Sequence, residues 1–196
     1  MTADENQWVL AVAKGDRQAF AMLVELHLHP IEAFATRMLA DSAEAQDVAQ
    51  EVMLRLWQRA SEFDPGRARL STWLHQIAHN LCIDRLRKIR RLSSWDEAQN
   101  HRSEDAHQTT QLGAQPMLST GHAAPMASSL ADERSAVVSR ALSQLPERQR
   151  SALLLTYYQA LTNREVADIM GISVRALESL LVRARTALKQ ALEGKI

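Results

Sequence analysis

TNREVADIMGISVRALESLLVRAR, residues 162–185, holds two short segments of helical periodicity on either side of Gly171. Thr162 and Glu165 have the spacing of a capping box, which predicts that the first helix begins there. Gly171 permits a tight turn, and Ser173 can cap the second helix. The stretch therefore predicts two helices joined by a short turn, the arrangement of a helix-turn-helix.

The second of these helices has an apolar face and a polar face. The helical periodicity predicts that four residues face a core: Leu177, Leu180, Leu181 and Ala184. It leaves five facing outward: Val174, Arg175, Glu178, Ser179 and Val182. In a DNA-binding helix-turn-helix, the N-terminal outward residues of the second helix enter the major groove. Basic side chains around the motif can approach phosphates, namely Arg148, Arg150, Arg164, Arg183, Arg185 and Lys189.

Glu178 is an acidic residue on the face that would meet DNA. Its carboxylate can accept a hydrogen bond from a cytosine amino group, which would give base preference without phosphate affinity. It can equally pair with Arg175 or Arg183 on the same helix. Both interpretations stay open from the sequence.

The composition favours an all-α protein. Aromatic residues make up 5% of the 196 residues, and Leu, Ala, Arg, Glu and Gln outnumber the β-branched types. No apolar run reaches the ~18 residues that cross a bilayer, and the N-terminus lacks the pattern of a signal peptide. Cys82 is the single cysteine, which excludes an internal disulfide and a cysteine-based zinc site. We expect a cytoplasmic protein without stable membrane insertion.

The net charge of zero conceals alternating blocks of charge. Residues 1–60 carry −4, residues 61–95 carry +4, residues 96–135 carry −4 and residues 136–196 carry +4. Two basic blocks separated by an acidic one suit a protein that contacts a polyanion at two places. Solvated helix faces without a partner would give the same pattern, so charge alone does not decide.

A first helical domain is expected over residues 5–92. Asp16 can cap one of its helices, and Pro30 suits the first turn of the next. Asp41 and Glu44 have the spacing of a capping box at the start of a third.

The rest of the chain divides into a loop, a long helix, a linker and a second domain. The segment 64–71 contains a Pro-Gly pair and predicts a loop, after which Ser71 caps the long helix. Ser, Thr, Gln and His dominate residues 93–131, which predicts a flexible linker. Helical periodicity then resumes, so residues 132–194 form a second small helical domain that contains the helix-turn-helix.

One helix of the first domain bears a mixed acidic and apolar stripe. Asp47, Gln50, Glu51 and Leu54 are spaced i, i+3, i+4 and i+7, which places them on one exposed face. Such a face can dock a basic helical partner.

The long helix ends in a basic cluster, with five bases in the seven residues 85–91. It is preceded by Trp73 and by a loop that carries Arg67 and Arg69. Basic side chains can hold the phosphate backbone of DNA, and an aromatic ring beside them can stack on a nucleobase. The combination suits strand-separated DNA, whose nucleobases can swing out of the helix. Trp73 can instead simply fill the core.

Five motifs occur in a fixed order along the chain: DVAQEVMLRLW, STWLHQIAHNLCIDRLR, LPERQRSALLLTYY, NREVADIMGIS and RARTAL. Together they resemble the extracytoplasmic-function class of sigma-70 factors, the promoter-recognition subunits of bacterial RNA polymerase. The resemblance covers residues 10–92 and 132–192.

The resemblance implies two sites in the first domain. The stripe of Asp47, Gln50, Glu51 and Leu54 would dock on core RNA polymerase. The loop and the helix after it would recognise and melt the −10 promoter element, with the candidates Arg67, Arg69, Ser71, Thr72, Trp73, Asn80, Arg85, Arg87, Lys88 and Arg91.

In the second domain the resemblance implies recognition of the −35 element in duplex form. The candidates are Arg148, Arg164, Ser173, Val174, Arg175, Glu178, Ser179, Arg183 and Arg185. Members of the family often carry basic residues where this chain has Glu178 and Leu180, so the −35 contacts do not transfer at those two positions.

The resemblance implies an alternative sigma factor that directs promoter-specific transcription initiation in a stress or environmental response. Its partners would be core RNA polymerase, promoter DNA and an anti-sigma factor. It implies neither an enzyme nor a cofactor.

The linker can be compared with promoter geometry. A flexible chain of 39 residues spans ~35 Å on average and ~130 Å at full extension. Promoter elements two helical turns apart are separated by ~70 Å. Because the linker must stretch beyond its average span, we expect the free protein to bind promoter duplex poorly until polymerase holds both domains.

Two other function classes remain to be compared. A stand-alone helix-turn-helix regulator would bind its operator directly, but its effector domain would need no basic helix end. A metal- or redox-responsive helical enzyme would draw on His27, His29, His75, His79 and Cys82. No acid–base or nucleophile constellation joins those residues, which favours ordinary surface or packing roles.

Overall fold

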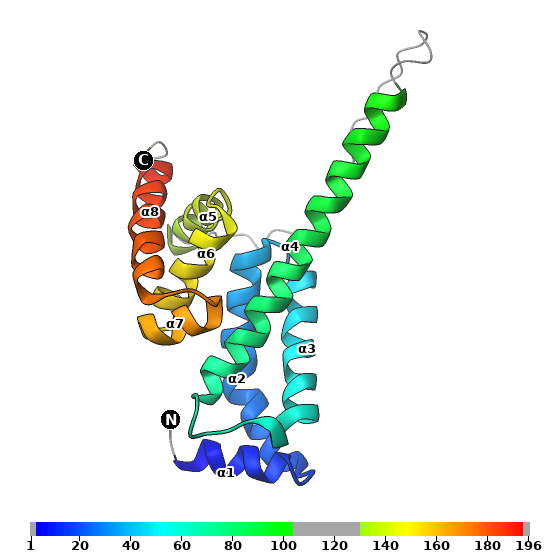
Figure 1. Cartoon of the computed structure of the whole chain (residues 1–196), viewed down its shortest axis with the longest axis vertical. Helices are drawn as coiled ribbons and strands as arrows, with labels where there is room; N and C mark the ends of the chain where they lie inside the picture. The colour runs from blue at the N-terminus through cyan, green and yellow to red at the C-terminus, as the bar shows by residue number, and fades with distance from the viewer. Residues whose placement is uncertain (1–2, 104–129, 194–196) are drawn as a thin grey trace.

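The computed structural model describes residues 3–103 and 130–193, and every regular element in these ranges is a helix (Figure 1). The helices form an N-terminal domain and a C-terminal domain, which confirms the predicted all-α fold with two small helical domains. Most of the expected linker, residues 104–129, lies outside the described residues.

The N-terminal domain consists of α1 (Ala3–Val12), α2 (Arg17–Leu39), α3 (Ser42–Arg59), the 3₁₀ turn η1 (Ala60–Glu62) and α4 (Leu70–Ser103). Asp16 caps α2 as predicted, because its carboxylate accepts hydrogen bonds from the backbone N–H groups of Gln18 and Ala19. Asp41 caps α3 in the same way by accepting from the N–H of Glu44. Both starts follow from local side-chain chemistry.

The prediction that Pro30 opens a separate helix is wrong, because Pro30 lies inside the continuous helix α2. A proline within a helix removes one backbone hydrogen bond and crowds the preceding turn. Here His27 lies buried before the proline, while Ile31 and Phe34 lie buried after it. The burial of side chains on both sides of Pro30 offsets the free-energy cost of the proline, so the helix stays continuous.

Two predicted boundaries of α4 are also wrong. The helix begins at Leu70, so Ser71 lies in its first turn and does not cap it. It continues to Ser103, so residues 93–103 are helical and not the start of a flexible linker. No glycine or proline interrupts residues 71–103, and once a helix is nucleated each further residue adds a hydrogen bond. Neither α4 nor any other described helix has the length and apolarity needed to cross a bilayer.

The C-terminal domain consists of α5 (Leu130–Ser143), α6 (Glu147–Leu153), the π-helical turn η2 (Leu154–Tyr158), α7 (Asn163–Met170) and α8 (Val174–Glu193). The predicted capping box is present, since Thr162 and Glu165 exchange hydrogen bonds at the start of α7. Gly171 ends α7 with φ of 62°, a left-handed conformation that glycine adopts without steric strain. Ser173 Oγ then accepts from the N–H of Ala176, as expected of a cap.

The two domains pack directly against each other (Figure 1). α7 lies against α4, while α5, α6 and η2 lie against α2. Gln159 Nε2 donates to the carbonyl oxygen of Pro30 at 3.2 Å. The guanidinium of Arg37 lies over the ring of Tyr158, 4.6 Å from its centroid. The buried apolar side chains of both domains therefore form one continuous cluster.

Candidate functional site

The outward face of α8 is arranged as the sequence predicts. Its five outward residues are all exposed: Val174, Arg175, Glu178, Ser179 and Val182. Leu177, Leu181 and Ala184 are buried, and Leu180 is half-buried. Arg164, in the capped first turn of α7, is exposed as well. The helix-turn-helix thus offers an exposed, largely polar helix face with arginines beside it.

The carboxylate of Glu178 is not engaged by its helical neighbours. Arg183 Nε instead donates to the backbone carbonyl of Ser179 at 3.2 Å. Glu178 takes part in none of the ion pairs that form between the described residues. The intrahelical pairing that the sequence left open is therefore not formed here, and the carboxylate is exposed for an outside partner.

The expectation that Arg150 approaches DNA phosphates is wrong, because its side chain is buried. Its side chain points into the domain and is 6% exposed. Burial lowers the pKa of its guanidinium, partly offset by nearby Cys82 of α4. The residue lies on the face of α6 that also buries Leu153, and burial on that face overrides the usual solvent preference of arginine.

The loop before α4 is held by local hydrogen bonds and ring packing. Asp64 Oδ1 accepts from the N–H of Gly66 at 2.8 Å, which closes the turn. Trp73 packs on Phe63 with 5.6 Å between ring centroids and is half-buried. Arg67 and Arg69 are exposed beside it. The tryptophan therefore contributes to packing while one part of it borders a surface hollow.

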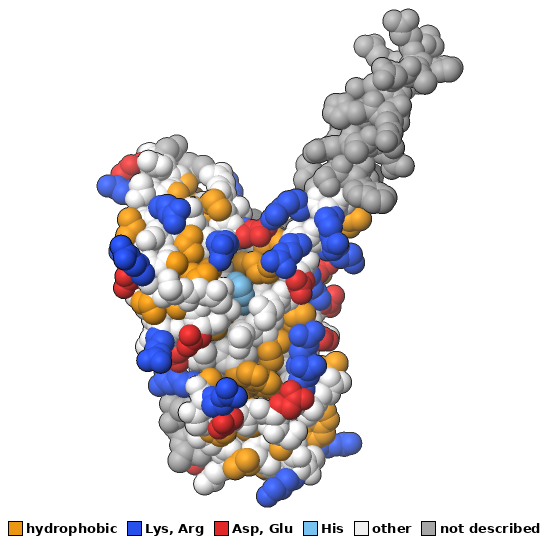
Figure 2. Space-filling view, viewed as in Figure 1, with side chains coloured by type: hydrophobic (Ala, Val, Ile, Leu, Met, Phe, Trp, Pro, Cys, Tyr) orange, Lys and Arg blue, Asp and Glu red, His pale blue; other side chains and the backbone are white. Residues whose placement is uncertain are grey.

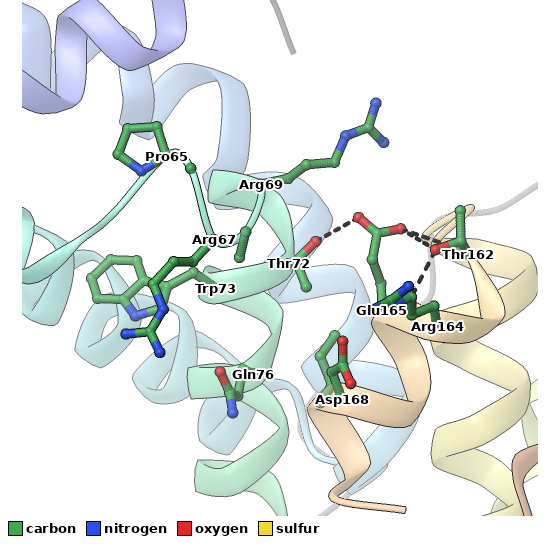
Figure 3. Close-up of a pocket in the computed structure, with 13 residues that line it drawn as sticks. Pro65, Arg67, Arg69, Thr72, Trp73, Gln76, Thr162, Arg164, Glu165 and Asp168 are labelled. Atoms are coloured by element: carbon green, nitrogen blue, oxygen red, sulfur yellow. Dashed lines mark hydrogen bonds between the residues drawn. The ribbon is translucent and has the colours of Figure 1, made fainter. Parts of the chain in front are cut away.

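That hollow, of about 470 Å³, lies between the two domains (Figure 3). On one side it is lined by Arg67, Trp73 and other residues of the loop and α4, and on the other by Arg164 and Asp168 of the C-terminal domain. Thr72 Oγ1 donates to Glu165 Oε1 across the boundary at 2.8 Å. Thr72 is only 7% exposed, in contrast to Arg67 and Arg69 of the preceding loop. The structure thus brings together loop residues and helix-turn-helix residues that the sequence assigned to separate sites.

Further along α4 the basic cluster is exposed. Arg87, Lys88 and Arg91 lie on the surface together with Asn80, and Arg87 lies 3.6 Å from Asp84 of the preceding turn. Figure 2 shows Lys and Arg side chains on both sides of a separate hollow, which lies between a later part of α4 and the C-terminal domain. Its lining residues from both domains include Arg90, Arg148 and Arg183.

Arg85 is separated from the rest of the basic cluster. Its Nη1 donates to the backbone carbonyl of Glu44 at 2.6 Å and to Glu44 Oε2 at 2.7 Å. The side chain therefore leans toward α3 and borders a different hollow from the one beside Trp73.

The mixed stripe of α3 lines the hollow that Arg85 borders. Asp47, Gln50 and Leu54 are exposed, while Glu51 is half-buried. Leu81 and Arg85 of α4 form the opposite wall. The hollow has a volume of about 600 Å³, which turns the predicted stripe into one side of a groove. No local pattern in the sequence identifies Leu81 as part of it, because that requires knowing how α3 and α4 pack.

Among the residues of the N-terminal domain whose burial the structure describes, three histidines are buried, namely His27, His75 and His79. Burial lowers the pKa of each ring. For His27 the neighbouring Glu5, 3.1 Å away, opposes this effect, and for His75 the carbonyl of Ser71 opposes it. The described residues contain no cluster of His, Cys, Asp and Glu that could hold a metal ion. Cys82 is buried as well, and burial raises the pKa of its thiol to about 12.

Comparison with known proteins gives the family. Residues 23–92 match the model of Sigma-70 region 2, and residues 135–188 match Sigma-70, region 4. The ECF RNA polymerase sigma factor SigW of Bacillus subtilis is 32% identical over 181 residues, which is 92% of either chain. The chain belongs to the extracytoplasmic-function class of the sigma-70 family. The RNA polymerase sigma-H factor of Pseudomonas aeruginosa is 31% identical and covers 96% of this sigma factor and 94% of its own length.

Two solved structures share the fold of this sigma factor. CnrH, in a complex with the cytosolic domain of CnrY, superposes with a TM-score of 0.68 at 22% identity over 98% of this chain and 99% of its own. RpoE of Bartonella quintana, in a complex with the anti-sigma factor NepR, has a TM-score of 0.64 at 24% identity, over 90% of this chain and 98% of its own.

Membership in the family has direct consequences for function. Sigma factors are transcription initiation factors and not enzymes, and their regions 2 and 4 bind core RNA polymerase and promoter DNA. In this sigma factor, the match to region 2 runs from residue 23 in α2 to residue 92 in α4, and the match to region 4 runs from residue 135 in α5 to residue 188 in α8. The groove beside α3 and the loop before α4 both belong to region 2.

Proposed function

We propose that the groove between α3 and α4 is the surface by which this alternative sigma factor docks on core RNA polymerase. The observation that carries the proposal is the common lining of the groove by Asp47, Gln50, Glu51 and Leu54. An acidic rim around an exposed leucine suits a basic amphipathic partner helix, because the apolar contact supplies affinity and the charges supply orientation.

The −10 element is assigned to the loop before α4 and to the exposed side of α4. This surface comprises Arg67, Arg69, Ser71, Thr72, Trp73, Asn80, Arg87, Lys88 and Arg91. The arginines and the lysine would hold the phosphate backbone, while the edge of Trp73 offers a stacking surface for an extruded base. Arg85 was expected among these residues, but its bonds to Glu44 favour a place in the polymerase groove.

The −35 element is assigned to the outward face of α8 and the arginines around it. The N-terminal half of α8 would enter the major groove with Ser173, Val174, Arg175, Glu178 and Ser179, while Arg148, Arg164, Arg183 and Arg185 would contact phosphates. The exposed and unpaired carboxylate of Glu178 supports the base-reading interpretation, since a carboxylate among phosphate-binding residues is useful only toward a hydrogen-bond donor.

Control by an anti-sigma factor completes the proposal. RpoE of Bartonella quintana forms a complex with the anti-sigma factor NepR, and its fold is shared by this chain. We infer that the present protein responds to a stress or environmental signal through a partner of that kind. Its place of action would be the cytoplasm, where RNA polymerase transcribes.

The test is transcription in vitro with purified core RNA polymerase and promoter templates selected from genomic fragments. The wild-type protein is expected to support initiation from a subset of templates, and Asp47→Arg is expected to abolish it. Direct binding to a duplex operator, together with no initiation by core enzyme, would instead identify a stand-alone helix-turn-helix regulator.

A further inference from the structure

The hollow between the later part of α4 and the C-terminal domain lies outside the polymerase groove and the proposed −10 surface (Figure 2). Its volume of about 620 Å³ falls in the range of small-molecule sites. Side chains from α4, α6 and α8 and the proline before α6 line it, among them Arg90, Pro146, Glu147, Arg148, Leu180 and Arg183. We call it the arginine hollow.

The arginine hollow carries an excess of positive charge. Arg90, Arg148 and Arg183 line it from three different helices, whereas Glu147 is the one carboxylate among its described lining residues. Glu147 forms an ion pair with Arg90. Arg148 and Arg183 take part in none of the ion pairs between the described residues. Two uncompensated cations beside one small volume repel each other, and a bound anion would remove that repulsion.

The guanidinium groups offer the donor geometry that phosphate prefers. Each presents a planar fork of N–H groups that can bind two oxygens of one phosphate. Arg183 is partly oriented by its own helix, because its Nε donates to the carbonyl oxygen of Ser179 at 3.2 Å. Its two terminal nitrogens are left for another partner. Three arginines on separate helices therefore favour an anion with several oxygens.

Part of the lining is apolar. Pro146 is exposed and Leu180 is half-buried, and both line the hollow. A proline ring and a leucine side chain can pack against a flat ring of a ligand, which removes apolar surface from water. An inorganic anion would leave these two side chains exposed. The hollow therefore suits an anion that also carries an aromatic ring.

Gln149 adds an unused hydrogen-bond acceptor to the hollow. The residue lines it and is half-buried, and its Oε1 is shielded from solvent without a hydrogen-bond partner among the described residues. An amide oxygen buried without a donor has a free-energy cost, which an N–H group of a ligand would remove. Phosphate groups carry no N–H, whereas the amino groups of nucleobases do.

We propose that the arginine hollow binds a nucleotide that carries two or more phosphates. The arginines hold the phosphates, Pro146 and Leu180 pack against the base, and Gln149 accepts from its amino group. Arg148 and Arg183 also belong to the −35 surface under the proposed function, so a bound nucleotide and promoter DNA exclude each other there. That consequence rests on the proposed function, but the binding site itself does not.

Isothermal titration calorimetry on the sigma factor alone, in magnesium-free buffer, tests the site with ADP, GDP, guanosine and inorganic pyrophosphate as probes. ADP or GDP is expected to bind at least tenfold more tightly than pyrophosphate, because burial of the base adds to the binding of the phosphates. Guanosine is expected to bind at least tenfold more weakly than GDP, because it has no phosphates. Nucleotide affinities no higher than that of pyrophosphate, or no nucleotide binding, would overturn the proposal.

Arg90 and Glu147 give a sharper test, because the two partners of one ion pair should act in opposite directions. Arg90→Gln removes a phosphate ligand and leaves Glu147 to repel anions, so it should weaken the binding of GDP and of pyrophosphate about tenfold. Glu147→Gln removes the carboxylate and releases Arg90, so it should tighten both about threefold. Weaker binding in both variants would show that the ion pair only holds the two sides of the hollow together, and the proposal would be wrong.

Leu180→Gln separates the base from the phosphates. It should weaken GDP about tenfold and leave the binding of pyrophosphate unchanged. The matched control is Arg140→Gln on α5, an exposed arginine whose Nε donates to the carbonyl oxygen of Ala136 and which does not line the hollow. Equal losses of GDP binding in Arg140→Gln and Arg90→Gln would identify general attraction of anions and overturn the proposal.

The two proposals fail in different ways. The proposed function is wrong if core polymerase supports no initiation with the wild-type protein. The nucleotide site is judged on the sigma factor without polymerase or DNA, so its failure leaves the proposed function untouched. Circular dichroism melting curves of each variant establish that the comparison is made between folded proteins.

Discussion

Glu51 Oε1 accepts a hydrogen bond from Arg55 Nε, one turn further along α3, at 2.8 Å. One turn earlier, Asp47 is exposed, and among the described residues no ion pair includes it. The two acids of the stripe are therefore unequal, since one is already compensated within the helix and the other is available to a basic partner.

This inequality leads to a first prediction for polymerase binding. Asp47→Arg reverses the available charge and should weaken binding of core RNA polymerase at least tenfold, because like charges would then face each other in the complex. Glu51→Gln should cost less than threefold, since the charge of Glu51 is already compensated by Arg55 within the helix. Fluorescence anisotropy with labelled sigma factor measures both, and equal losses for the two variants would contradict the assignment.

Arg85 and Lys88 provide a second, matched pair on α4. Arg85→Ala removes the two bonds to Glu44 that join α3 to α4, so it should weaken polymerase binding and leave promoter melting by the assembled holoenzyme unchanged. Lys88→Ala should leave polymerase binding unchanged and reduce open-complex formation more strongly as salt is raised. Permanganate footprinting of the melted strand separates the two outcomes. If promoter melting is still defective when core polymerase is saturated with the Arg85→Ala protein, Arg85 belongs to the −10 surface after all.

Glu178 gives a third prediction, concerning base preference. If its carboxylate accepts from a cytosine amino group, Glu178→Ala should change the ranking of promoter variants by about 1–3 kcal/mol at a single position of the −35 element. Initiation assays on templates with each base at that position measure the ranking. A uniform change in activity on all templates would rule out base reading by this residue.

The buried histidines give a fourth prediction, on pH. Burial holds the pKa values of His27, His75 and His79 below the ordinary value of 6.5, so the unfolded chain takes up protons first when the pH falls. Stability is therefore complete above pH 6.5 and decreases as the pH falls from there toward the folded-state pKa values. The urea midpoint should be lower at pH 5.5 than at pH 7.5.

The histidine prediction has an internal control. His29 is exposed on the same helix as His27, so His29→Gln is the matched surface variant whose pH dependence is compared with that of the wild type. His79→Gln should lose part of it, because the buried ring is also near the positive charges of Arg148 and Arg87. A midpoint that is independent of pH over this range in the wild type would show that the rings do not titrate as argued.

Cys82 gives a fifth prediction. Because only the thiolate reacts and burial raises its pKa to about 12, alkylation by iodoacetamide at pH 8 should be at least a hundredfold slower in the folded protein than in denaturant. Mass spectrometry follows the reaction. Rapid labelling under native conditions would show that the region around α4 opens more readily than its burial indicates.

Local sequence patterns predicted the helix starts and the polar face of α8. Asp16, Thr162 and Ser173 cap helices as expected, since capping depends on residues two or three positions apart. The periodicity of α8 identified Leu177 as buried and Glu178 as exposed, since Leu177 belongs to the apolar stripe at positions 177, 181 and 184 and Glu178 falls outside it. The motifs gave the family because their order spans almost the whole chain.

The features that sequence reasoning missed all depend on packing between distant segments. Pro30 stays inside α2 because residues on both sides of it are buried, and Arg150 turns inward because α6 packs on that face. Arg85 leaves the basic cluster because Glu44 lies across from it on α3. Thr72 is covered by Glu165, which lies 93 positions away in the chain. No local pattern carries such information.

The carboxylate of Glu165 is bonded both within its own domain and to the other one. Whatever melts the first turn of α7 must also release Thr72, and whatever draws the domains apart leaves that turn with one constraint fewer. Heat should consequently melt the free protein in a single cooperative transition in calorimetry, with matching calorimetric and van't Hoff enthalpies. Substitutions that break the contacts between α4 and α7 should let each domain unfold on its own, so this interface makes two domains behave as one folding unit.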